Sequence, residues 1–174
     1  MASVPSFSSI PLASRARTTR PQRSTLLLAG FLCLVVGSTR WLRFNVSHSL
    51  PYGLYRLHAV PPTLTRGMLV LMPVPPSVQH VWSRWVPLLK PIAGVPGDRI
   101  ELLGEDLRIH DVSFGPVLVH AHGQALPQIR GSWIVADDEI FVASTVPRSL
   151  DGRYFGCTKV AALTAVATPL LTWR

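Results

Sequence analysis

Residues Asn45–Tyr55 read Asn-Val-Ser-His-Ser-Leu-Pro-Tyr-Gly-Leu-Tyr and directly follow an apolar N-terminal segment. Ser49 is a candidate nucleophile in this stretch. Leu50-Pro51 restricts the backbone to extended conformations, and Gly53 permits a turn or a close backbone approach. An exposed, stiff loop of this kind suits a serine whose backbone N–H group helps to bind an oxyanion. The stretch therefore predicts a reactive serine between the membrane-proximal segment and the first strand of a β domain.

A second serine, Ser47, lies two residues before Ser49 and on the same side of an extended chain. Its hydroxyl group is placed to donate a hydrogen bond to an oxyanion. Taken alone, both serines are also ordinary turn residues. The triplet Asn45-Val46-Ser47 in addition fits the pattern of a glycosylation acceptor.

Lys90 is the candidate base for this serine. It lies in Leu88–Asp98, which reads Leu-Leu-Lys-Pro-Ile-Ala-Gly-Val-Pro-Gly-Asp, and it is one of only two lysines in the chain. A lysine can accept a proton only when neutral, so its pKa must fall several units below about 10.4, as burial among apolar groups can achieve. Pro91 keeps Lys90 extended. The alternative is a strand-end lysine with a buried stem and a hydrated head.

A third element, Ser149–Gly156, reads Ser-Leu-Asp-Gly-Arg-Tyr-Phe-Gly. The order of serine, apolar-flanked lysine and Ser-x-Asp-Gly-Arg is that of a Ser/Lys dyad peptidase. From about Leu42 to its end, the chain resembles the TraF-type signal peptidases of conjugative transfer systems, a branch of the type I signal peptidase superfamily. The first and last motifs carry most of this resemblance.

The resemblance implies three catalytic functions in the first two motifs. Ser49 would attack the scissile carbonyl carbon, and Lys90 would be the general base. Ser47, through its hydroxyl group, and Ser49 would form the oxyanion hole. A Pro91 follows the lysine where this family often has an arginine.

The last motif would support the dyad, again by resemblance. Ser149 would orient the lysine amine, and Asp151 would pair with Arg153 and brace the site. Neither a cofactor nor a metal ion is implied. The chain would thus be a serine endopeptidase of the signal peptidase type.

The substrates implied by the resemblance are exported pre-proteins with small residues before the cut, above all the pilin subunit of a conjugative apparatus. Some relatives also join the new pilin ends into a ring. Hydrolysis and cyclisation share an acyl-enzyme and differ in whether water or an amine resolves it, so this choice stays open. A housekeeping type I signal peptidase and a non-catalytic accessory protein of a secretion machine are the alternatives.

The basic charge is concentrated at the N-terminus. Net charge is +8, yet the chain after Arg43 has eleven basic and nine acidic residues, 11 − 9 = +2. A basic tail beside an apolar segment argues against nucleic-acid binding. It also argues against a cytosolic LexA-type repressor, which shares the dyad but carries a DNA-binding domain.

The predicted organisation has three parts: a disordered basic cytoplasmic tail (1–23), a single transmembrane anchor (24–43) and a periplasmic peptidase domain (44–174). The uncharged residues 24–39 span about 24 Å as a helix, less than the roughly 30 Å of a hydrocarbon core. Flanking arginines and aromatics can extend the span. The four tail arginines favour an N-terminus inside and the rest of the chain outside. Together with the resemblance, this implies a single-pass protein of the bacterial inner membrane, with lipid and the transfer machinery as partners. A cleaved secretory signal is the competing interpretation.

The sixteen prolines and twelve glycines are spread along the chain, which favours many short strands. We predict a mainly β, signal-peptidase-like antiparallel domain with one short amphipathic helix. The helix is expected at Ser77–Val86, with an apolar surface around Trp82 and Trp85. The expected strands are 53–58, 67–73, 88–95, 99–103, 107–110, 117–120, 132–135 and 139–144, followed by a strand pair in 160–171.

Histidine chemistry offers two further alternatives. A Ser/His/Asp hydrolase lacks support, because no Gly-x-Ser-x-Gly sequence is present and His48 adjoins Ser49 in an extended segment that points their side chains apart. His120-Ala121-His122 has the spacing of two ligands on one strand face, but no third ligand is evident in the sequence. A solvated strand edge is the simpler interpretation of these histidines.

Overall fold

The computed structural model describes residues 23–38, 40–121 and 123–173, so the predicted tail, Thr39 and His122 lie outside the described residues. The chain divides into two units, residues 1–36 and 37–174. Helix α1 extends over Arg23–Ser38, so all but its last two residues belong to the first unit. Among the residues described, no helix combines the length and apolar character needed to cross a lipid bilayer.

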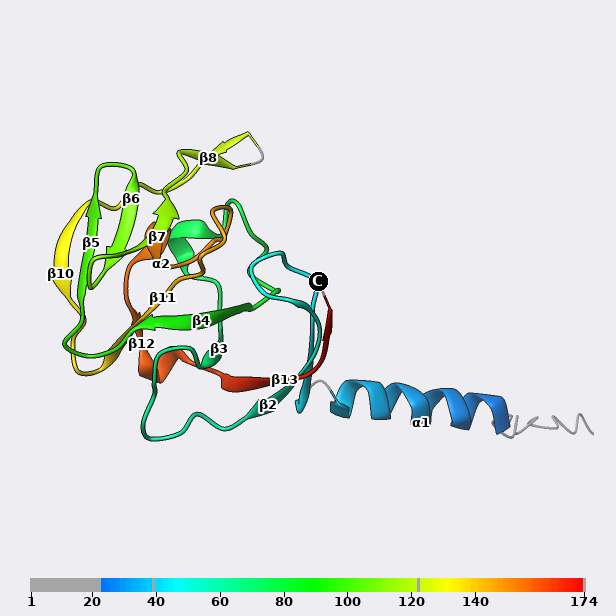
Figure 1. Ribbon diagram of the computed structural model, residues 1–174. Helices are drawn as coiled ribbons and strands as arrows, with labels where there is room; N and C mark the ends of the chain where they lie inside the picture. The colour runs from blue at the N-terminus through cyan, green and yellow to red at the C-terminus, as the bar shows by residue number, and fades with distance from the viewer. Residues whose placement is uncertain (1–22, 39, 122, 174) are drawn as a thin grey trace, which may run out of the picture. The chain divides into compact units, whose positions relative to one another are not determined.

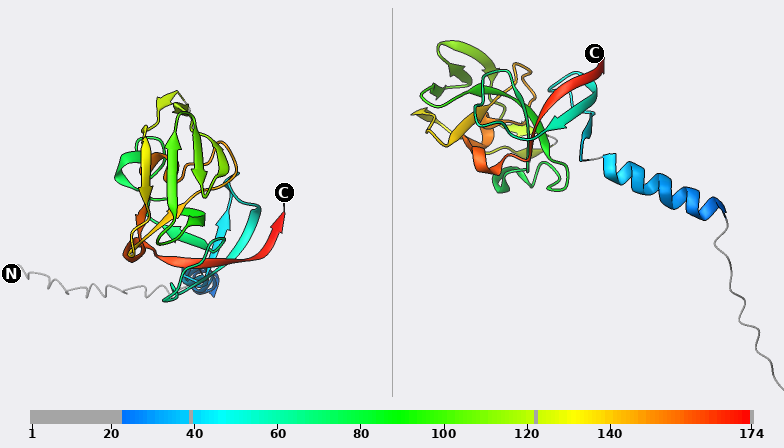
Figure 2. Two further views of the ribbon diagram at one scale, coloured as in Figure 1. Left: turned by 60° about the vertical axis from the view of Figure 1, so that its left-hand side comes forward. Right: turned by 90° about the horizontal axis from the view of Figure 1, so that it is seen from below.

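The second unit contains a seven-stranded sheet with the order β1-β2-β13-β3-β4-β11-β12, in which all neighbours are antiparallel. Figure 1 shows the long strand β13 alongside β2, its antiparallel partner, and Figure 2 shows both at one side of the domain. The strands are β1 (Leu42–Asn45), β2 (Tyr52–His58), β3 (Leu69–Met72), β4 (Leu88–Gly94), β11 (Glu139–Val142), β12 (Thr158–Lys159) and β13 (Ala165–Trp173). The predicted mainly β, antiparallel character is confirmed.

A four-stranded antiparallel sheet with the order β10-β5-β6-β7 forms the other part of this unit, and β8 and β9 make a small hairpin. These strands are β5 (Arg99–Leu103), β6 (Asp106–Ile109), β7 (Val112–Pro116), β8 (His120–Ala121), β9 (Gln124–Ala125) and β10 (Gly131–Ile134). The helical elements are short, namely η1 (Pro76–Val78), α2 (Gly152–Phe155) and η2 (Val160–Ala162).

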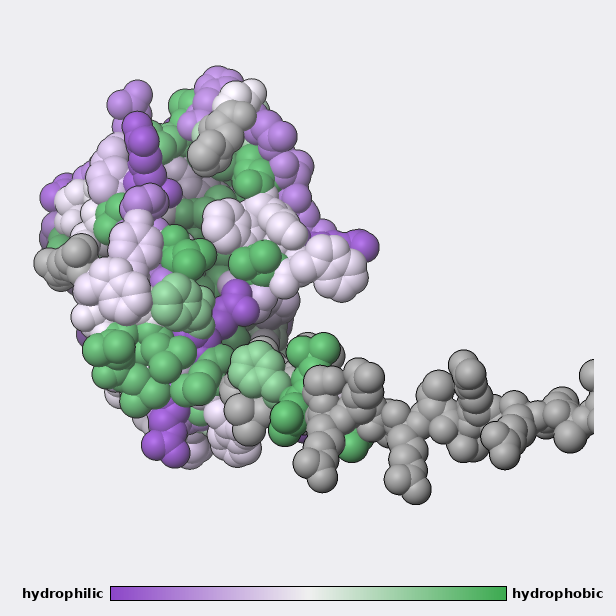
Figure 3. Space-filling model, turned by 90° about the vertical axis from the view of Figure 1, so that its right-hand side faces the viewer, coloured by the Kyte–Doolittle hydropathy of each residue, from purple (hydrophilic) through white to green (hydrophobic). Residues whose placement is uncertain are grey.

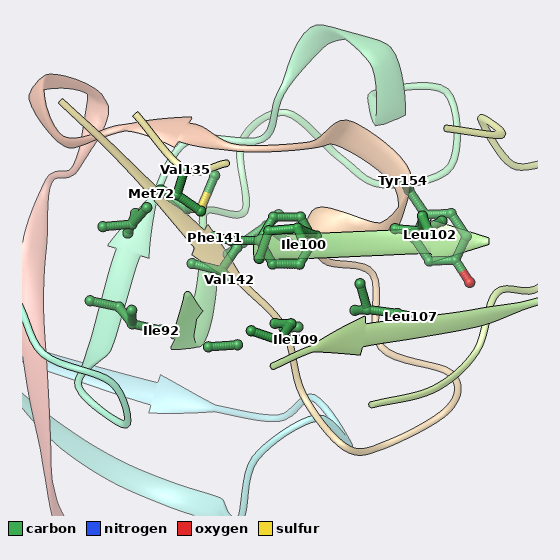
Figure 4. Close-up of a cluster of buried hydrophobic side chains, with 14 of the residues drawn as sticks. Met72, Ile92, Ile100, Leu102, Leu107, Ile109, Val135, Phe141, Val142 and Tyr154 are labelled. Atoms are coloured by element: carbon green, nitrogen blue, oxygen red, sulfur yellow. The ribbon is translucent and has the colours of Figure 1, made fainter. Parts of the chain in front are cut away.

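The larger hydrophobic core joins the two sheets, and Figure 4 shows its side chains meeting. Ile100 and Leu107 enter it from the four-stranded sheet, while Ile92 and Phe141 enter it from the seven-stranded sheet. Each fully buried side chain of this kind contributes about 1.5–3 kcal/mol. Six of the seven residues of β4 are buried, so β4 is held rigidly between its neighbours. This matters because β4 carries Lys90.

The structure contradicts the predicted helix at Ser77–Val86. Only the single 3-10 turn η1 forms there, followed by irregular turns. Prolines at both ends leave ten residues, too few for a stable helix without strong packing. The indole of Trp82 instead donates to the carbonyl oxygen of Val86 at 2.8 Å, and Trp85 is 78% exposed. The expected helical surface of the two tryptophans is therefore absent from this described segment.

Two of the strand predictions are also wrong. The strand expected at 117–120 is replaced by β7, which starts at Val112 because His110 and Asp111 adopt positive φ angles of 47° and 62° and form a tight turn after β6. The strand pair expected in 160–171 is one strand, β13. Its pairing with β2 is interrupted between Pro169 and Leu171, as expected for a residue without an N–H group.

The other predicted strands are confirmed within a few residues at each end. The hairpin of β5 and β6 and the turn at Asp137-Asp138 are present as expected. The structure adds β1, which no pattern indicated. This strand includes Leu42 and Arg43, residues that the sequence analysis assigned to the anchor.

Candidate active site

The candidate nucleophile lies in the connection between β1 and β2. These strands pair from Leu42 opposite Arg56 to Asn45 opposite Gly53, so residues 46–51 must turn back over a short distance. The hydroxyl group of Tyr55 donates to the carbonyl oxygen of Pro51 at 2.7 Å and fixes one side of the loop. Ser49 is only 8% exposed. The loop is thus an ordered structure around a nearly buried serine.

Lys90 extends from the middle of β4 to this serine. Its Nζ atom is 2.7 Å from Ser49 Oγ and 3.0 Å from Ser149 Oγ, and the residue is 4% exposed. The predicted burial of Lys90 is confirmed, and the alternative of a hydrated head is wrong. Three residues that are far apart in sequence thereby meet in one buried hydrogen-bonded group.

The burial of Lys90 lowers its pKa to about 8. Burial is the largest cause because it penalises the charged form. The negative charge of Asp151 raises the pKa, while the positive charge of Arg153 lowers it. With a pKa of about 8, on the order of one-tenth of the amine is neutral at pH 7, so it can accept a proton near neutral pH.

Ser47 lies beside the nucleophile, with its Oγ atom 3.2 Å from Ser49 Oγ. Its hydroxyl group also donates to Asn45 Oδ1 at 2.7 Å. A hydroxyl group has one hydrogen. In this arrangement Ser47 therefore offers a lone pair to Ser49, and its hydrogen must turn before it can donate to an oxyanion.

Asp151 and Arg153 form a buried ion pair next to the dyad. Arg153 Nε lies 2.8 Å from Asp151 Oδ1, and both side chains are 0% exposed. Between them, Gly152 is packed so tightly that a Cβ atom would lie 2.7 Å from the carbonyl oxygen of Val142. The Asp-Gly-Arg sequence is thus explained by an ion pair whose middle residue has no room for a side chain.

The Arg153 guanidinium group also connects segments that border the site. It donates to the carbonyl oxygens of Pro116 at 3.0 Å, Phe114 at 3.3 Å and Ser144 at 2.6 Å. Asp151 Oδ2 in turn accepts the N–H group of Ser144 at 3.0 Å. The pair therefore holds the backbone beside Ser49 in place and makes no direct contact with its hydroxyl group.

The structure adds two polar residues that the sequence analysis did not assign to the site. Ser144 donates through its hydroxyl group to the backbone carbonyl oxygen of Ser49 at 3.1 Å. The Asn45 side chain bonds several backbone groups of the Ser49 loop. Ser144 bonds a backbone atom far away in the sequence, and Asn45 bonds the turn that directly follows it. The motif spacing signalled neither of them, although Asn45 is the only asparagine in the chain.

Asp98 explains the Pro-Gly-Asp sequence that follows β4. It accepts hydrogen bonds from the N–H group of Val95 at 2.8 Å, from Arg66 Nε at 2.9 Å and from His110 Nε2 at 2.7 Å. Burial raises the pKa of this carboxyl group, but the bonds from Arg66, His110 and Val95 together hold the pKa below its usual value. Asp98 thus fixes the turn at the end of the strand that carries Lys90.

A cleft of about 830 Å³ opens beside Ser49. It is lined by residues 48–52, 66–67, 91–93, 114 and 143–146. Apolar groups dominate the lining, and none of the described residues that contribute to it is an aspartate or a glutamate. A cleft of this composition suits an extended, largely uncharged peptide segment next to the candidate nucleophile.

The histidines are placed away from the dyad hydrogen bonds. His48 Nδ1 lies 2.5 Å from the hydroxyl group of Tyr52, at the rim of the cleft. Among the described residues, no three His, Cys, Asp or Glu side chains are grouped as metal ligands. His120 is exposed on β8, and its neighbour His122 lies outside the described residues.

Comparison with known families identifies the class of protein. Residues 22–172 match the family described as "Signal peptidase, peptidase S26". Because the match extends over most of the chain, the protein belongs to this family.

Its relatives include proteins named for conjugal transfer. The chain is 28% identical to conjugal transfer protein TraF of Agrobacterium fabrum, a match that covers 85% of this chain and 91% of that protein. It is 29% identical to a probable conjugal transfer protein TraF of Sinorhizobium fredii, and this match covers 94% of this chain and 96% of that protein. A signal peptidase I structure from Enterococcus faecalis covers 64% of this chain and 100% of its own, at 22% identity and a TM-score of 0.39.

Proposed function

We propose that this protein is a membrane-anchored serine endopeptidase that removes signal or leader peptides from exported proteins. Its substrate would be the pilin subunit of a conjugative transfer system. The observation that carries the proposal is the buried contact of 2.7 Å between Lys90 Nζ and Ser49 Oγ. Family membership supports the reaction class, and the names of the TraF relatives support the conjugative substrate over a housekeeping role.

In the proposed mechanism, neutral Lys90 removes the hydroxyl proton of Ser49 as its Oγ atom attacks the scissile carbonyl carbon. The carbonyl oxygen becomes an oxyanion, which the Ser49 N–H group and the Ser47 hydroxyl group would bind. When the C–N bond breaks, the Lys90 ammonium group returns its proton to the leaving amine. Water, or a second amine, then attacks the ester and releases Ser49.

The first half of β4 offers a binding mode for an extended substrate, because β3 pairs with it on one side while β11 pairs only with its second half on the other. Ala143 N donates to the carbonyl oxygen of Pro91 at 3.2 Å, and β11 pairs with β4 at Ile92 and Gly94. Two residues before Pro91, the backbone of Leu89 points to the same side of the strand. We propose that a substrate strand pairs there, which would place its scissile bond next to Ser49.

We further propose that the apolar segment that precedes β1 anchors the protein in the bacterial inner membrane and that the peptidase domain, which includes Leu42 and Arg43 in β1, is periplasmic. Large hydrophobic side chains are exposed on β1 and β13, including Phe44, Leu171 and Trp173. The rings of Phe44 and Trp173 lie 5.8 Å apart. Figure 3 shows hydrophobic clusters between hydrophilic ones on the face where these strands lie. Such a face fits contact with membrane lipid.

The proposal is tested by cleavage of a co-encoded pilin precursor in proteoliposomes that contain the full chain. The wild type is compared with Ser49→Ala and Lys90→Ala, and each variant is checked for folding by its thermal unfolding. Loss of cleavage in both folded variants is the expected result. Cleavage that persists in Lys90→Ala would overturn the dyad. A general signal-peptide substrate tests the housekeeping alternative, and failure of the wild type on both substrates supports the non-catalytic accessory role.

The same assay separates hydrolysis from cyclisation by product mass. A circular pilin is lighter than the linear hydrolysis product by one water molecule, because an amine in place of water resolves the ester. A peptidase without ring-closing activity gives only the linear mass.

A further inference from the structure

Asn45 makes an unusual set of contacts with the loop that carries Ser49. Its Nδ2 atom lies 3.1 Å from the carbonyl oxygen of Ser47, 3.3 Å from that of Leu50 and 3.1 Å from that of Pro51. Its Oδ1 atom accepts the Ser47 N–H group at 3.2 Å and the Ser47 hydroxyl group at 2.7 Å. One side chain therefore bonds both ends of the loop.

The geometry defines which end of the amide is which. The three carbonyl oxygens need a donor, and the N–H group of Ser47 needs an acceptor, so Nδ2 and Oδ1 can take only the observed orientation. Asn45 is 6% exposed and both of its amide hydrogens are directed at the loop. This arrangement leaves no room for a glycan on Nδ2 in the folded protein, which argues against the glycosylation pattern noted in the sequence.

Asn45 also determines what Ser47 can do. While Asn45 Oδ1 accepts the Ser47 hydroxyl hydrogen, Ser47 Oγ faces Ser49 Oγ at 3.2 Å as an acceptor. To donate to an oxyanion, the hydroxyl group must rotate about its Cβ–Oγ bond and give up one hydrogen bond. The Ser47 N–H group can stay on Oδ1 during this rotation, so the backbone of the loop need not move.

We propose that Asn45 is a positioning residue that holds the Ser49 loop in its reactive shape. It thereby keeps the Ser47 hydroxyl group where it can turn from Asn45 Oδ1 to the oxyanion. The proposal rests on the proposed peptidase function. It assigns Asn45 an action through Ser47 and the loop backbone, without contact with substrate. Removing Asn45 should therefore weaken transition-state binding more than substrate binding.

Two measurements test this proposal. The first is hydrogen exchange of the loop amides in the full chain in detergent micelles, which needs no activity. Asn45→Ala is expected to speed exchange of the Ser47 amide at least about tenfold, because its acceptor is lost. Gln79→Ala is the matched control, since Gln79 also donates an amide hydrogen to a loop carbonyl oxygen, that of Val74, at 3.0 Å. The control should leave the Ser47 amide unchanged.

The second measurement is the kinetics of precursor cleavage. Asn45→Ala should lower kcat roughly 10–100-fold with KM changed less than about threefold, because the loop no longer holds the Ser47 hydroxyl group in place, and one well-placed oxyanion donor accounts for about 10²–10³ in kcat. In a Ser47→Ala background the same change should cost much less than it does alone, since both act through one hydroxyl group. Asn45→Asp keeps the acceptor but directs a carboxylate at three carbonyl oxygens, so it should not rescue kcat.

The outcomes are distinguishable from failure of the proposed function. If the wild type cleaves no precursor, the peptidase proposal fails, and the exchange measurement alone decides whether Asn45 holds the loop. Unchanged Ser47 exchange in Asn45→Ala overturns the positioning role. A wild-type kcat in Asn45→Ala also overturns it. So does a loss of kcat from Asn45→Ala that is as large in the Ser47→Ala background as in the wild type. If Asn45→Ala does not fold, Asn45→Leu, which is similar in size to asparagine but offers no acceptor to the Ser47 N–H group, is tested against the same criteria.

Discussion

Two buried polar regions lie side by side in this domain and handle charge in opposite ways. Lys90 is 4% exposed, and its hydrogen-bond partners are the neutral hydroxyl groups of Ser49 and Ser149. Arg153 is 0% exposed, and its charge meets the Asp151 carboxylate at 2.8 Å. One region buries a charge without an ion-pair partner, and the other buries a matched pair.

The difference teaches where reactivity and rigidity come from. An amine without a carboxylate partner has its pKa lowered to about 8, so it exchanges protons near neutral pH. A matched ion pair braces the segments bonded to it. Asp151 and Arg153 therefore support the site through the backbone of Ser144, while Lys90 does the proposed chemistry.

The largest effect is expected when Lys90, the buried charge without an ion-pair partner, is replaced. Lys90→Met should reduce cleavage about 10⁴-fold or more, because the proton acceptor is lost. It should also stabilise the fold at pH 7 by roughly 1–3 kcal/mol, since it removes a buried charge whose pKa is depressed from 10.5 to about 8. Steady-state kinetics and denaturant unfolding check the two results.

The sign of this stability change depends on pH. A lysine with a lowered folded pKa costs stability when both states are protonated, and the cost disappears as pH rises from about 8 to 10.5. The advantage of Lys90→Met should shrink over that window. Lys159→Met, which changes the exposed second lysine, is the control and should leave cleavage unchanged. A Lys90→Met protein that is clearly less stable than wild type at pH 7 would contradict this account.

The second largest effect is expected when the buried ion pair of Asp151 and Arg153 is broken. Asp151→Asn should destabilise the fold by about 3–5 kcal/mol, because it leaves the Arg153 charge buried without a partner. The double change Asp151→Leu with Arg153→Met should recover much of this loss. Denaturant unfolding measures both variants. Asp138→Asn, which breaks an exposed pair with Lys159, is the control and should not move the midpoint. Equal effects of Asp151→Asn and Asp138→Asn would refute the bracing role.

A smaller effect sharpens the Lys90 side of the comparison. Ser149→Ala removes one of the two hydroxyl groups that hold the amine, so it should lower kcat roughly 10–100-fold with little change in KM. Stopped assays over a range of precursor concentrations separate kcat from KM. Ser132→Ala, on β10 and bonded to Arg99, is a control outside the site. A loss confined to KM would assign Ser149 to substrate binding.

The smallest effect is the pH profile of the wild type. Because the neutral amine is the active form, kcat/KM should rise about tenfold per pH unit below pH about 8 and then level off. His48→Ala should keep this profile. Loss of activity, or of this rising limb, in a folded His48→Ala variant would point to a histidine base in place of Lys90.

Much of the site could be predicted from sequence because its groups stand in motifs with chemical reasons. An apolar-flanked lysine predicts burial, and a serine before Leu-Pro predicts a stiff loop; the burial of Lys90 is confirmed. Asn45 and Ser144 could not be found in this way. Ser144 bonds the carbonyl oxygen of Ser49, which only folding brings near, and backbone atoms carry no sequence signal. Asn45 bonds groups within six residues of itself, but its residue type alone does not specify the turn that brings them to its side chain.

The fold shows the same division. Strands with buried apolar runs, such as β4, were located within a residue or two, since continuous burial leaves a clear pattern. The segment 77–86 has helical spacing of its apolar residues. The prolines at both of its ends nevertheless prevent a longer helix, so the apolar spacing alone gave a wrong prediction. Strand β7 was missed because its pairing follows from the tight turn at His110-Asp111.

The most direct test of the central claim is an NMR titration of the two lysines in the full chain, with ¹³C-labelled lysine in detergent micelles. Lys159 is exposed, and its hydrogen bond to Asp138 raises its pKa, so the two signals should separate, and Lys159→Arg assigns them. The account predicts that the Lys90 ε-carbon titrates with a pKa of about 8. A Lys90 signal that titrates at or above the ordinary lysine pKa of about 10.4 would contradict it.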